Sequence, residues 1–311
     1  IFTGMLVYDA FTVFFRTLLT FVTVLFIILT RISGLTDREN GSDFYTLVLG
    51  AALGMCLMAS ANHLLIVFLA VEMASVPSYA LVGILKGDRK SSEASIKYAV
   101  YGAGAAGVML YGISLLAGIS GSAHIPTIAW RLSQGMGTDY QLVLVLAALM
   151  IMVGLAFKLS AVPFHFWCPD VFEGASAEVN GFLSVASKAA ALALLVRLAV
   201  GFSVPPASEP MVNPPTSVAV DGIQHSGQAF AKPVVEGQHL QQVREIPGVN
   251  RQEQGRDRIV DEVQIVQVAA ESQQVTSSVT AIRKFLAYMI AILAAITCTF
   301  GNLAAYGQAN I

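Results

Sequence analysis

Two lysines lie inside apolar stretches of this sequence, where a charged side chain is costly to bury. Lys158 lies in the stretch 153–165, with Pro163 five residues after it, and Lys188 lies in the next apolar run. A charged side chain near the centre of a bilayer costs about 2.5–3.5 kcal/mol on insertion scales. Ionisable residues that are this costly to place usually mark ion or proton pathways. We therefore expect both lysines to have a function.

One acidic residue lies in a comparable position. Glu72 is inside the third apolar run, and Pro77 follows it at the same distance of five residues. A proline has no N–H to donate to the carbonyl four residues before it, and its ring pushes that carbonyl away. The carbonyls of Met73 and Leu159 are thus expected to be free, each beside a charged residue. A broken or widened turn there could admit water or accept a proton donor; two ordinary proline kinks are the simpler alternative.

The connection after Lys158 is short, aromatic and acidic. His165 could relay protons there, because imidazole gains and loses a proton near physiological pH. A structural hydrogen bond at a helix end is an equally good interpretation of His165. Asp170 and Glu173 are expected to be a solvated, helix-capping pair rather than catalytic acids. Nothing in this connection has the spacing of a metal site or an activated nucleophile.

Composition identifies the class of protein. The chain has 311 residues, of which 55% are hydrophobic and 12% are charged, whereas soluble domains carry about 25% charged residues. The apolar runs are long rather than short and alternating, which favours an all-α transmembrane bundle over a barrel. The three cysteines are scattered and imply neither a disulfide framework nor a metal site. No basic cluster suggests a nucleic-acid partner. The long apolar runs make the lipid bilayer the expected environment.

Seven apolar runs are long enough to span a membrane. They predict a polytopic helical bundle with spans near 6–30, 44–61, 63–85, 94–119, 140–162, 177–200 and 285–308. The loop 86–93, together with Lys97, is rich in basic residues, and the positive-inside rule places it in the cytoplasm. Alternation of the spans then places the segment 201–284 on the opposite side.

Residues 201–284 differ abruptly from the rest. Seven prolines interrupt a region rich in Gln, Val and charge, which predicts a polar, disordered or weakly ordered extramembrane insert. We therefore expect three parts: a bundle over 1–200, the insert, and a further transmembrane helix over 285–311. The chain begins at Ile1 without a methionine and ends directly after an apolar run, so we expect a fragment.

Several linked motifs resemble a known family, the antiporter-like membrane subunits of respiratory complex I, and in particular subunit N (subunit 2 in mitochondria). The resemblance covers about 1–200 and 285–311. Its motifs are Asn62–Leu64, Val71–Met73 with Pro77, Ser92–Tyr98, Phe157–His165, Trp167–Ala175, Ser187–Lys188 and Phe300–Ile311.

This resemblance implies roles for individual residues. Glu72 would be the acid paired with Lys158, the lysine of a broken helix, and Lys188 would be the relay lysine of the following helix. Lys97 and His165 fall on motif positions whose roles are less defined. The family contains two inverted repeats, and this chain would hold the first repeat and the opening helix of the second. Residues 201–284 depart from the family, whose corresponding loop is short.

The implied function is proton translocation within NADH:quinone oxidoreductase. Partners would be the other membrane subunits, in a bacterial cell membrane or an equivalent energy-transducing membrane. NADH, flavin, iron–sulfur clusters and quinone would belong to partner subunits, because this sequence shows no Gly-rich nucleotide loop and no cysteine cluster. Two alternatives remain: a subunit of a cation/proton antiporter or membrane-bound hydrogenase, which share the ancestral module, and a non-catalytic scaffold with static ion pairs.

Overall fold

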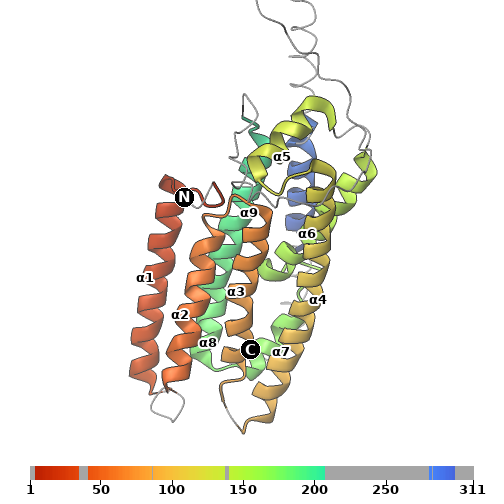
Figure 1. Cartoon of the computed structure of the whole chain (residues 1–311). Helices are drawn as coiled ribbons and strands as arrows, with labels where there is room; N and C mark the ends of the chain where they lie inside the picture. Colours follow the sequence, from red (N-terminus) through yellow and green to blue (C-terminus); the bar gives the residue numbers. More distant parts are fainter. Residues whose placement is uncertain are drawn as a thin grey trace, which may run out of the picture. The chain divides into compact units, whose positions relative to one another are not determined.

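The structure is a computed structural model that describes residues 4–34, 41–85, 87–136, 140–206, 280–281 and 283–297. These residues form helices and connections without a β-sheet, which confirms the predicted all-α class (Figure 1). The helices are α1 (Ala10–Ser33), α2 (Gly41–Met58), α3 (Leu64–Val82), α4 (Arg89–Ser120), α5 (Ile125–Arg131), α6 (Gln141–Leu159), α7 (Trp167–Gly174), α8 (Ala177–Phe182) and α9 (Lys188–Ser203). A π-helical turn, Leu183–Ser187, joins α8 to α9.

Six stretches in the described part of the chain are long and apolar enough to cross a membrane. They are α1, α2, α3, α4, α6 and the continuous stretch Ala177–Ser203, and they match the first six predicted spans. The seventh prediction, 285–308, is helical over residues 283–297, and its remainder lies outside the described residues. Most of the predicted insert also lies outside them, and α9 extends into its first residues. The count of seven spans and the division into three parts stay predictions.

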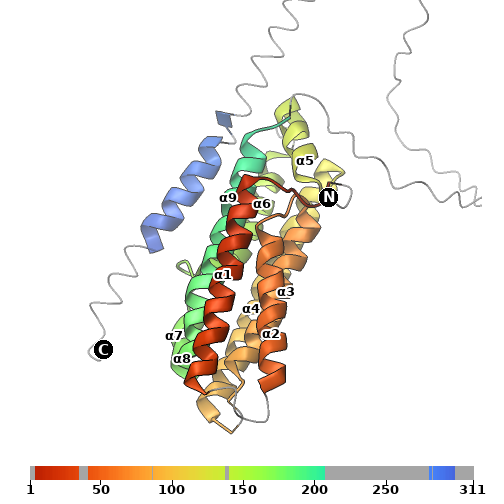
Figure 2. The same ribbon diagram turned by 90° about the vertical axis from the view of Figure 1, so that its left-hand side faces the viewer.

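The bundle has a different short helix at each end. Figures 1 and 2 show α5 beside the end of α9, and α7 at the opposite end of the bundle, beside the start of α4. With 32 residues, α4 is about 48 Å long at 1.5 Å per residue, which exceeds a hydrocarbon layer of about 30 Å. Its first turns therefore extend past the apolar layer, where they reach α7.

The two predicted proline breaks behave differently. α3 continues through Pro77 as an unbroken helix, so the expected break beside Glu72 does not form; one missing backbone hydrogen bond is not enough to end a helix that is packed on both sides. α6 does end before Pro163. Ser160 adopts a left-handed conformation with φ of 56°, and helical structure resumes only at Trp167. The predicted broken helix is therefore present after Lys158.

Glycine brings α2 and α3 into close contact. A Cβ atom built on Gly54 would lie 2.5 Å from the backbone nitrogen of Ala74, closer than any real contact. Gly54, which follows Gly50 in a small-xxx-small pattern, thus marks a close helix crossing, as small residues do in membranes. Gly50 itself contributes little, since its added Cβ would meet only the Pro77 side chain, at 3.8 Å.

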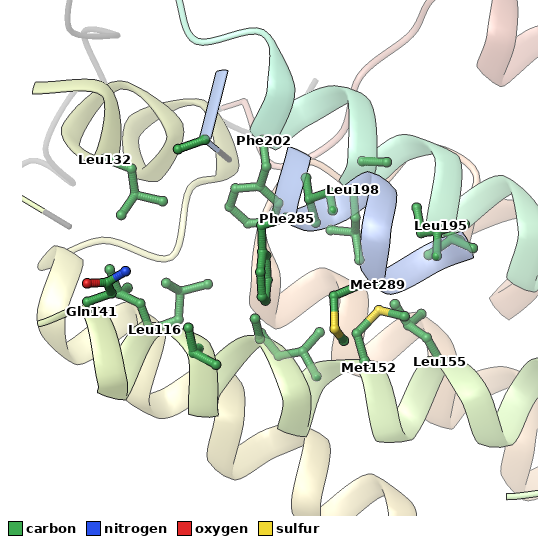
Figure 3. A pocket seen from close by; sticks show the side chains of 18 of the residues that line it. Leu116, Leu132, Gln141, Met152, Leu155, Leu195, Leu198, Phe202, Phe285 and Met289 are labelled. Atoms are coloured by element: carbon green, nitrogen blue, oxygen red, sulfur yellow. The ribbon is translucent and has the colours of Figure 1, made fainter. Parts of the chain in front are cut away.

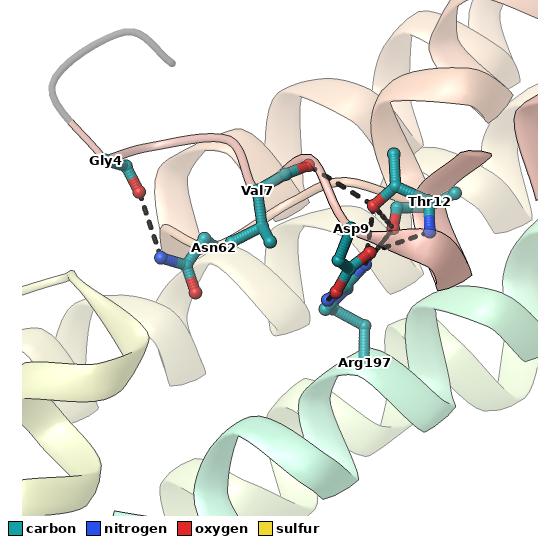
Figure 4. A network of polar contacts seen from close by, with 7 residues as sticks. Gly4, Val7, Asp9, Thr12, Asn62 and Arg197 are labelled. Carbon is teal, nitrogen blue, oxygen red and sulfur yellow. Dashed lines mark hydrogen bonds and ion pairs between the residues drawn. The ribbon is translucent and has the colours of Figure 1, made fainter. Parts of the chain in front are cut away.

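A polar network fixes α9, the helix that carries Lys188, to the start of α1 (Figure 4). Arg197 forms a bidentate ion pair with Asp9, with nitrogen–oxygen distances of 2.7 and 2.9 Å. It also donates to the Thr12 hydroxyl at 2.6 Å and to the Ala59 carbonyl. Asp9 in turn caps α1 by accepting from the Thr12 backbone N–H. One arginine therefore ties together α1, α9 and the end of α2.

The Gly54 crossing predicts a difference between two glycine substitutions. Gly54→Ala forces α2 and α3 apart and should lower the free energy of unfolding by about 1–3 kcal/mol, the usual range for overpacking. The control is Gly104→Ala on α4, where an added Cβ meets nothing within 4 Å and helix propensity improves. Thermal unfolding of both variants in detergent checks this. Equal melting temperatures for the two variants would contradict the assigned crossing.

The Asp9–Arg197 pair predicts a pH-dependent contribution to stability. The hydrogen bonds from Arg197 hold the pKa of Asp9, which precedes α1, well below its usual range. The stabilisation is therefore complete above the pKa of an unfolded Asp, about 3.9, and is lost as the pH falls below that value. Asp9→Asn keeps a capping side chain but removes the charge. Because the carboxylate is 40% exposed, and thus partly screened, we expect a loss of only about 1 kcal/mol at pH 7.

Unfolding of wild type and Asp9→Asn in detergent, compared between pH 7 and pH 3, measures this effect. The difference between them should shrink on acidification. The matched control is Asp43→Asn in the first turn of α2, whose carboxylate has no ion pair with a described residue. A difference that does not vary with pH would show that the charge of Asp9 is not the stabilising feature.

Candidate functional site

Lys158 is a buried and unpaired lysine. It is the penultimate residue of α6 and is 3% exposed. Among the described residues, no polar atom lies within hydrogen-bonding distance of its Nζ. A buried ammonium without a partner carries the full desolvation penalty, which amounts to several kcal/mol. Such a side chain is held in an unfavourable state by the fold around it.

Glu72 faces Lys158 from α3 without touching it. Its carboxylate is half-buried and interacts electrostatically with Lys158, but the two groups form no ion pair. Ser75 and Tyr79 follow Glu72 on α3 at helical spacing, and the Ser75 hydroxyl donates to the Val71 carbonyl. The Tyr79 hydroxyl also interacts electrostatically with the Glu72 carboxylate. A polar stripe therefore begins at Glu72 and runs along α3.

Lys188 caps the broken end of α6. It is the first residue of α9, directly after the π-helical turn 183–187. Its Nζ donates to the Lys158 carbonyl at 3.0 Å and to the Ser160 hydroxyl. The last carbonyls of a helix lack intrahelical donors and carry partial negative charge, so a cation stabilises them. The two predicted lysines thus meet at the break: the ammonium of Lys188 binds the backbone carbonyl of Lys158.

Aromatic rings close the site on the side of α4 and α7. Trp167 stacks on Tyr98 with ring centroids 4.3 Å apart and donates its Nε1–H to the Phe157 carbonyl at 3.2 Å. Trp167 and Tyr98 are almost fully buried. The ammonium of Lys188 lies 4.8 Å from the centroid of the Trp167 ring. The surroundings of the two lysines are thus mostly apolar and aromatic.

His165 and Lys97 lie outside this group. The Nδ1 atom of His165, in the connection between α6 and α7, is buried and has no hydrogen-bond partner among the described residues. Lys97 lies in the first part of the long helix α4 and forms ion pairs with Glu93 at 2.9 Å and with Asp170 at 3.1 Å. The structure therefore brings Lys97 together with surface carboxylates, and not with Glu72, Lys158 or Lys188.

Asp170 and Glu173 have a structural role that sequence reasoning described only as capping. Asp170 binds Lys97, and Glu173 binds Lys90 at 2.7 Å. An added Cβ on Gly174 would lie 2.6 Å from both Ala94 and the Lys90 carbonyl. Ion pairs and close packing therefore hold α7 against the start of α4, which fixes one side of the break.

Sequence reasoning gave no role to four residues that line the site. Ser160 and Trp167 lie inside two of the motifs that carry the family resemblance. Their contacts could not be predicted, because they depend on how the chain turns after Leu159. Ser75 and Tyr79 could have been found, because they lie three and seven residues after Glu72 and so share its helix face.

An apolar cavity lies elsewhere in the bundle. It has a volume of about 370 Å³ and lies among α4, α6, α9 and the helical segment 283–297 (Figure 3). Gln141 is its polar lining side chain, and the rest of the lining is apolar, including Leu116, Met152 and Phe285. Glu72, Lys158 and Lys188 do not line it. Among the described residues, no three His, Cys, Asp or Glu side chains are grouped to hold a metal ion.

Comparison with known proteins identifies relatives over 63% of the chain. NADH-quinone oxidoreductase subunit N of Desulfitobacterium hafniense is 43% identical over 197 residues, which is 63% of this chain and 39% of the relative. Subunit N of Chlorobium chlorochromatii is 41% identical over 198 residues, which is 63% of this chain and 38% of that protein. The chain thus spans about two fifths of the length of these curated relatives.

Solved structures give the same picture. A chain of respiratory complex I from Thermus thermophilus with bound aureothin is 34% identical, with a TM-score of 0.52 over 63% of this chain and 43% of that chain. A chain of an archaeal membrane-bound sulfane sulfur reductase, an archaeal respiratory membrane complex, shares the fold at 23% identity, with a TM-score of 0.51 over 60% of this chain and 37% of that chain.

The likeness extends to a family as well as to single proteins. Residues 61–213 match the family described as NADH:quinone oxidoreductase/Mrp antiporter, TM, and six helices of the described chain are apolar enough to span a membrane. The chain is an integral, multi-pass membrane protein. The resemblance seen in its motifs is confirmed: residues 61–213 match the model of that family, and the curated relatives that the chain resembles are subunits N of NADH-quinone oxidoreductase.

Proposed function

We propose that this chain is part of a proton-translocating membrane subunit of NADH:quinone oxidoreductase, in which Glu72, Lys158 and Lys188 relay protons. The observation that carries the proposal is the buried Nζ of Lys158, which has no hydrogen-bond partner among the described residues. A lysine with a purely structural role would be expected to end in an ion pair. The curated relatives named above support the reaction.

The relay works by changing the surroundings of Lys158. When the Glu72 carboxylate is close, its charge stabilises the ammonium form of Lys158; when it withdraws, burial favours release of the proton. A tenfold change in proton affinity corresponds to about 1.4 kcal/mol. Small shifts between α3 and α6 therefore suffice to switch Lys158 between binding and releasing a proton.

Lys188 receives the proton that Lys158 releases. The two ammonium groups repel each other when both are charged, so transfer requires Lys188 to be neutral when the proton arrives. Ser160 binds Lys188 at the break, and its hydroxyl can both accept and donate a hydrogen bond. His165 is a further candidate for passing protons to the end of the bundle where α7 lies.

The redox chemistry and the remainder of the proton path belong to other parts of the assembly. NADH, flavin, iron–sulfur clusters and quinone would be bound by partner subunits, and the contacts would be made with other membrane subunits of the complex. The basic residues Arg89, Lys90 and Lys97 gather on the first turns of α4, beside α7. By the positive-inside rule this end faces the cytoplasm, and the segment 201–284 lies on the other side.

A cation/proton antiporter subunit is the second candidate, because the matched family also includes Mrp antiporters. Transport that depends on sodium would favour it. A non-catalytic scaffold is less well supported, since Lys158 forms no ion pair with a described residue.

Replacement of Lys158 tests the proposal directly. In the complete subunit, within the assembled complex, Lys158→Met should reduce proton pumping at least tenfold while the complex still assembles. The reason is that methionine fills a similar apolar space but cannot carry a proton. Proton uptake into inverted membrane vesicles, driven by NADH, measures the effect.

The matched control is Lys284→Met, which replaces an exposed lysine in the helical segment 283–297. This variant should pump at the rate of wild type. Undiminished pumping by Lys158→Met would exclude Lys158 from the relay.

A further inference from the structure

Lys188 is bound by a ring as well as by oxygen atoms. Its Nζ lies over Trp167, 4.8 Å from the ring centroid, while it donates to the Lys158 carbonyl and the Ser160 hydroxyl. We propose that Trp167 is a positioning residue for Lys188: its indole face holds the ammonium at the broken end of α6. This inference rests on the proposed relay, and it assigns Trp167 a role within it.

The indole has one fixed orientation. Trp167 is 3% exposed, and its ring stacks on Tyr98 of α4 at an interplanar angle of 13°. Its Nε1–H donates to the Phe157 carbonyl of α6 at 3.2 Å. Stacking fixes the plane of the ring, and the hydrogen bond fixes its rotation within that plane. Lys188 therefore meets a rigid surface rather than a mobile side chain.

Position in the chain strengthens this constraint. Trp167 is the first residue of α7, and α7 is held against α4 by the Lys90–Glu173 and Lys97–Asp170 ion pairs. The ring thus links three elements at the break: the end of α6, the start of α7 and the side of α4. The place of the Lys188 ammonium follows from the place of this ring.

An indole suits a lysine that must give up its proton. Among aromatic side chains, tryptophan attracts a cation most strongly, and the attraction grows when water is excluded. The ring stabilises the charged form but offers no atom that takes the proton, as a carboxylate would. Lys188 is thereby held near Lys158 without a competing proton acceptor at that face.

The first test compares two replacements of Trp167 in the complete subunit of the assembled complex. Trp167→Phe keeps an aromatic face, whereas Trp167→Leu keeps only apolar bulk. NADH-driven proton pumping should fall about tenfold with leucine and stay within about threefold of wild type with phenylalanine, because a phenyl ring retains part of the cation–π attraction. The amount of subunit in the assembled complex is measured alongside, so that loss of folding is separated from loss of function.

The second test detects the contact without any activity. The chain has two tryptophans, so Trp130→Phe leaves Trp167 as the single indole of the purified chain in detergent. In this background Lys188→Met should shift the fluorescence emission maximum, since a charge beside the indole is removed. Lys188→Arg should leave it near its original value. Lys158→Met is the matched control, because it removes a buried lysine that does not lie over the ring, and its shift should be smaller.

The outcomes separate this inference from the proposed function. If Lys188→Met abolishes pumping but Trp167→Leu pumps like wild type, the relay stands and the role of Trp167 is wrong. An emission maximum that does not respond to Lys188→Met would also overturn it. If Lys188→Met itself pumps normally, the proposed relay fails, and a positioning role for Trp167 fails with it even where the emission shift reports the contact.

Discussion

The site depends on one constraint, which is that a helix ending inside an apolar bundle leaves backbone carbonyls without donors. In a membrane each such group costs several kcal/mol unless the protein supplies a partner. Here α6 ends at Leu159, and the ammonium of Lys188 supplies that partner by binding the Lys158 carbonyl. The break therefore determines where the second lysine lies, and the same backbone carries the first lysine. Lys188 binds the backbone carbonyl of Lys158 itself, so the two lysines are necessarily close to each other.

The remaining contacts hold the elements around this break. On one side, α7 is fixed to α4 by ion pairs at the surface and by the close approach of Gly174. On the other, α9 is anchored further along its length, where Arg197 binds Asp9 and Thr12. These contacts contribute stability that offsets the unfavourable burial of Lys158. A protein that keeps one lysine buried and unpaired needs such support elsewhere, as functional sites generally do.

Much of this arrangement could be predicted from the sequence, and the reasons for the rest are physical. Long apolar runs predicted six of the observed helices, and the cost of placing Lys158 and Lys188 in a bilayer singled out two residues that meet at the end of α6. Pro163 correctly predicted a break, but Pro77 did not, because tertiary packing decides whether a proline ends a helix. The contacts of Trp167 and Lys97 depend on how α7 lies against α4, and spacing along the chain does not determine that. Tyr79 could have been found from its helix face.

The central claim is that Glu72 and Lys158 act as one unit in proton transfer. A double-mutant cycle in the assembled complex tests it most directly, with NADH-driven proton pumping measured for Glu72→Gln, Lys158→Met and the two combined. Residues that act through each other are not additive. The account predicts that the double variant pumps no more slowly than the slower single variant. A double variant whose loss equals the product of the two single losses would show that the residues act independently, and it would contradict the account.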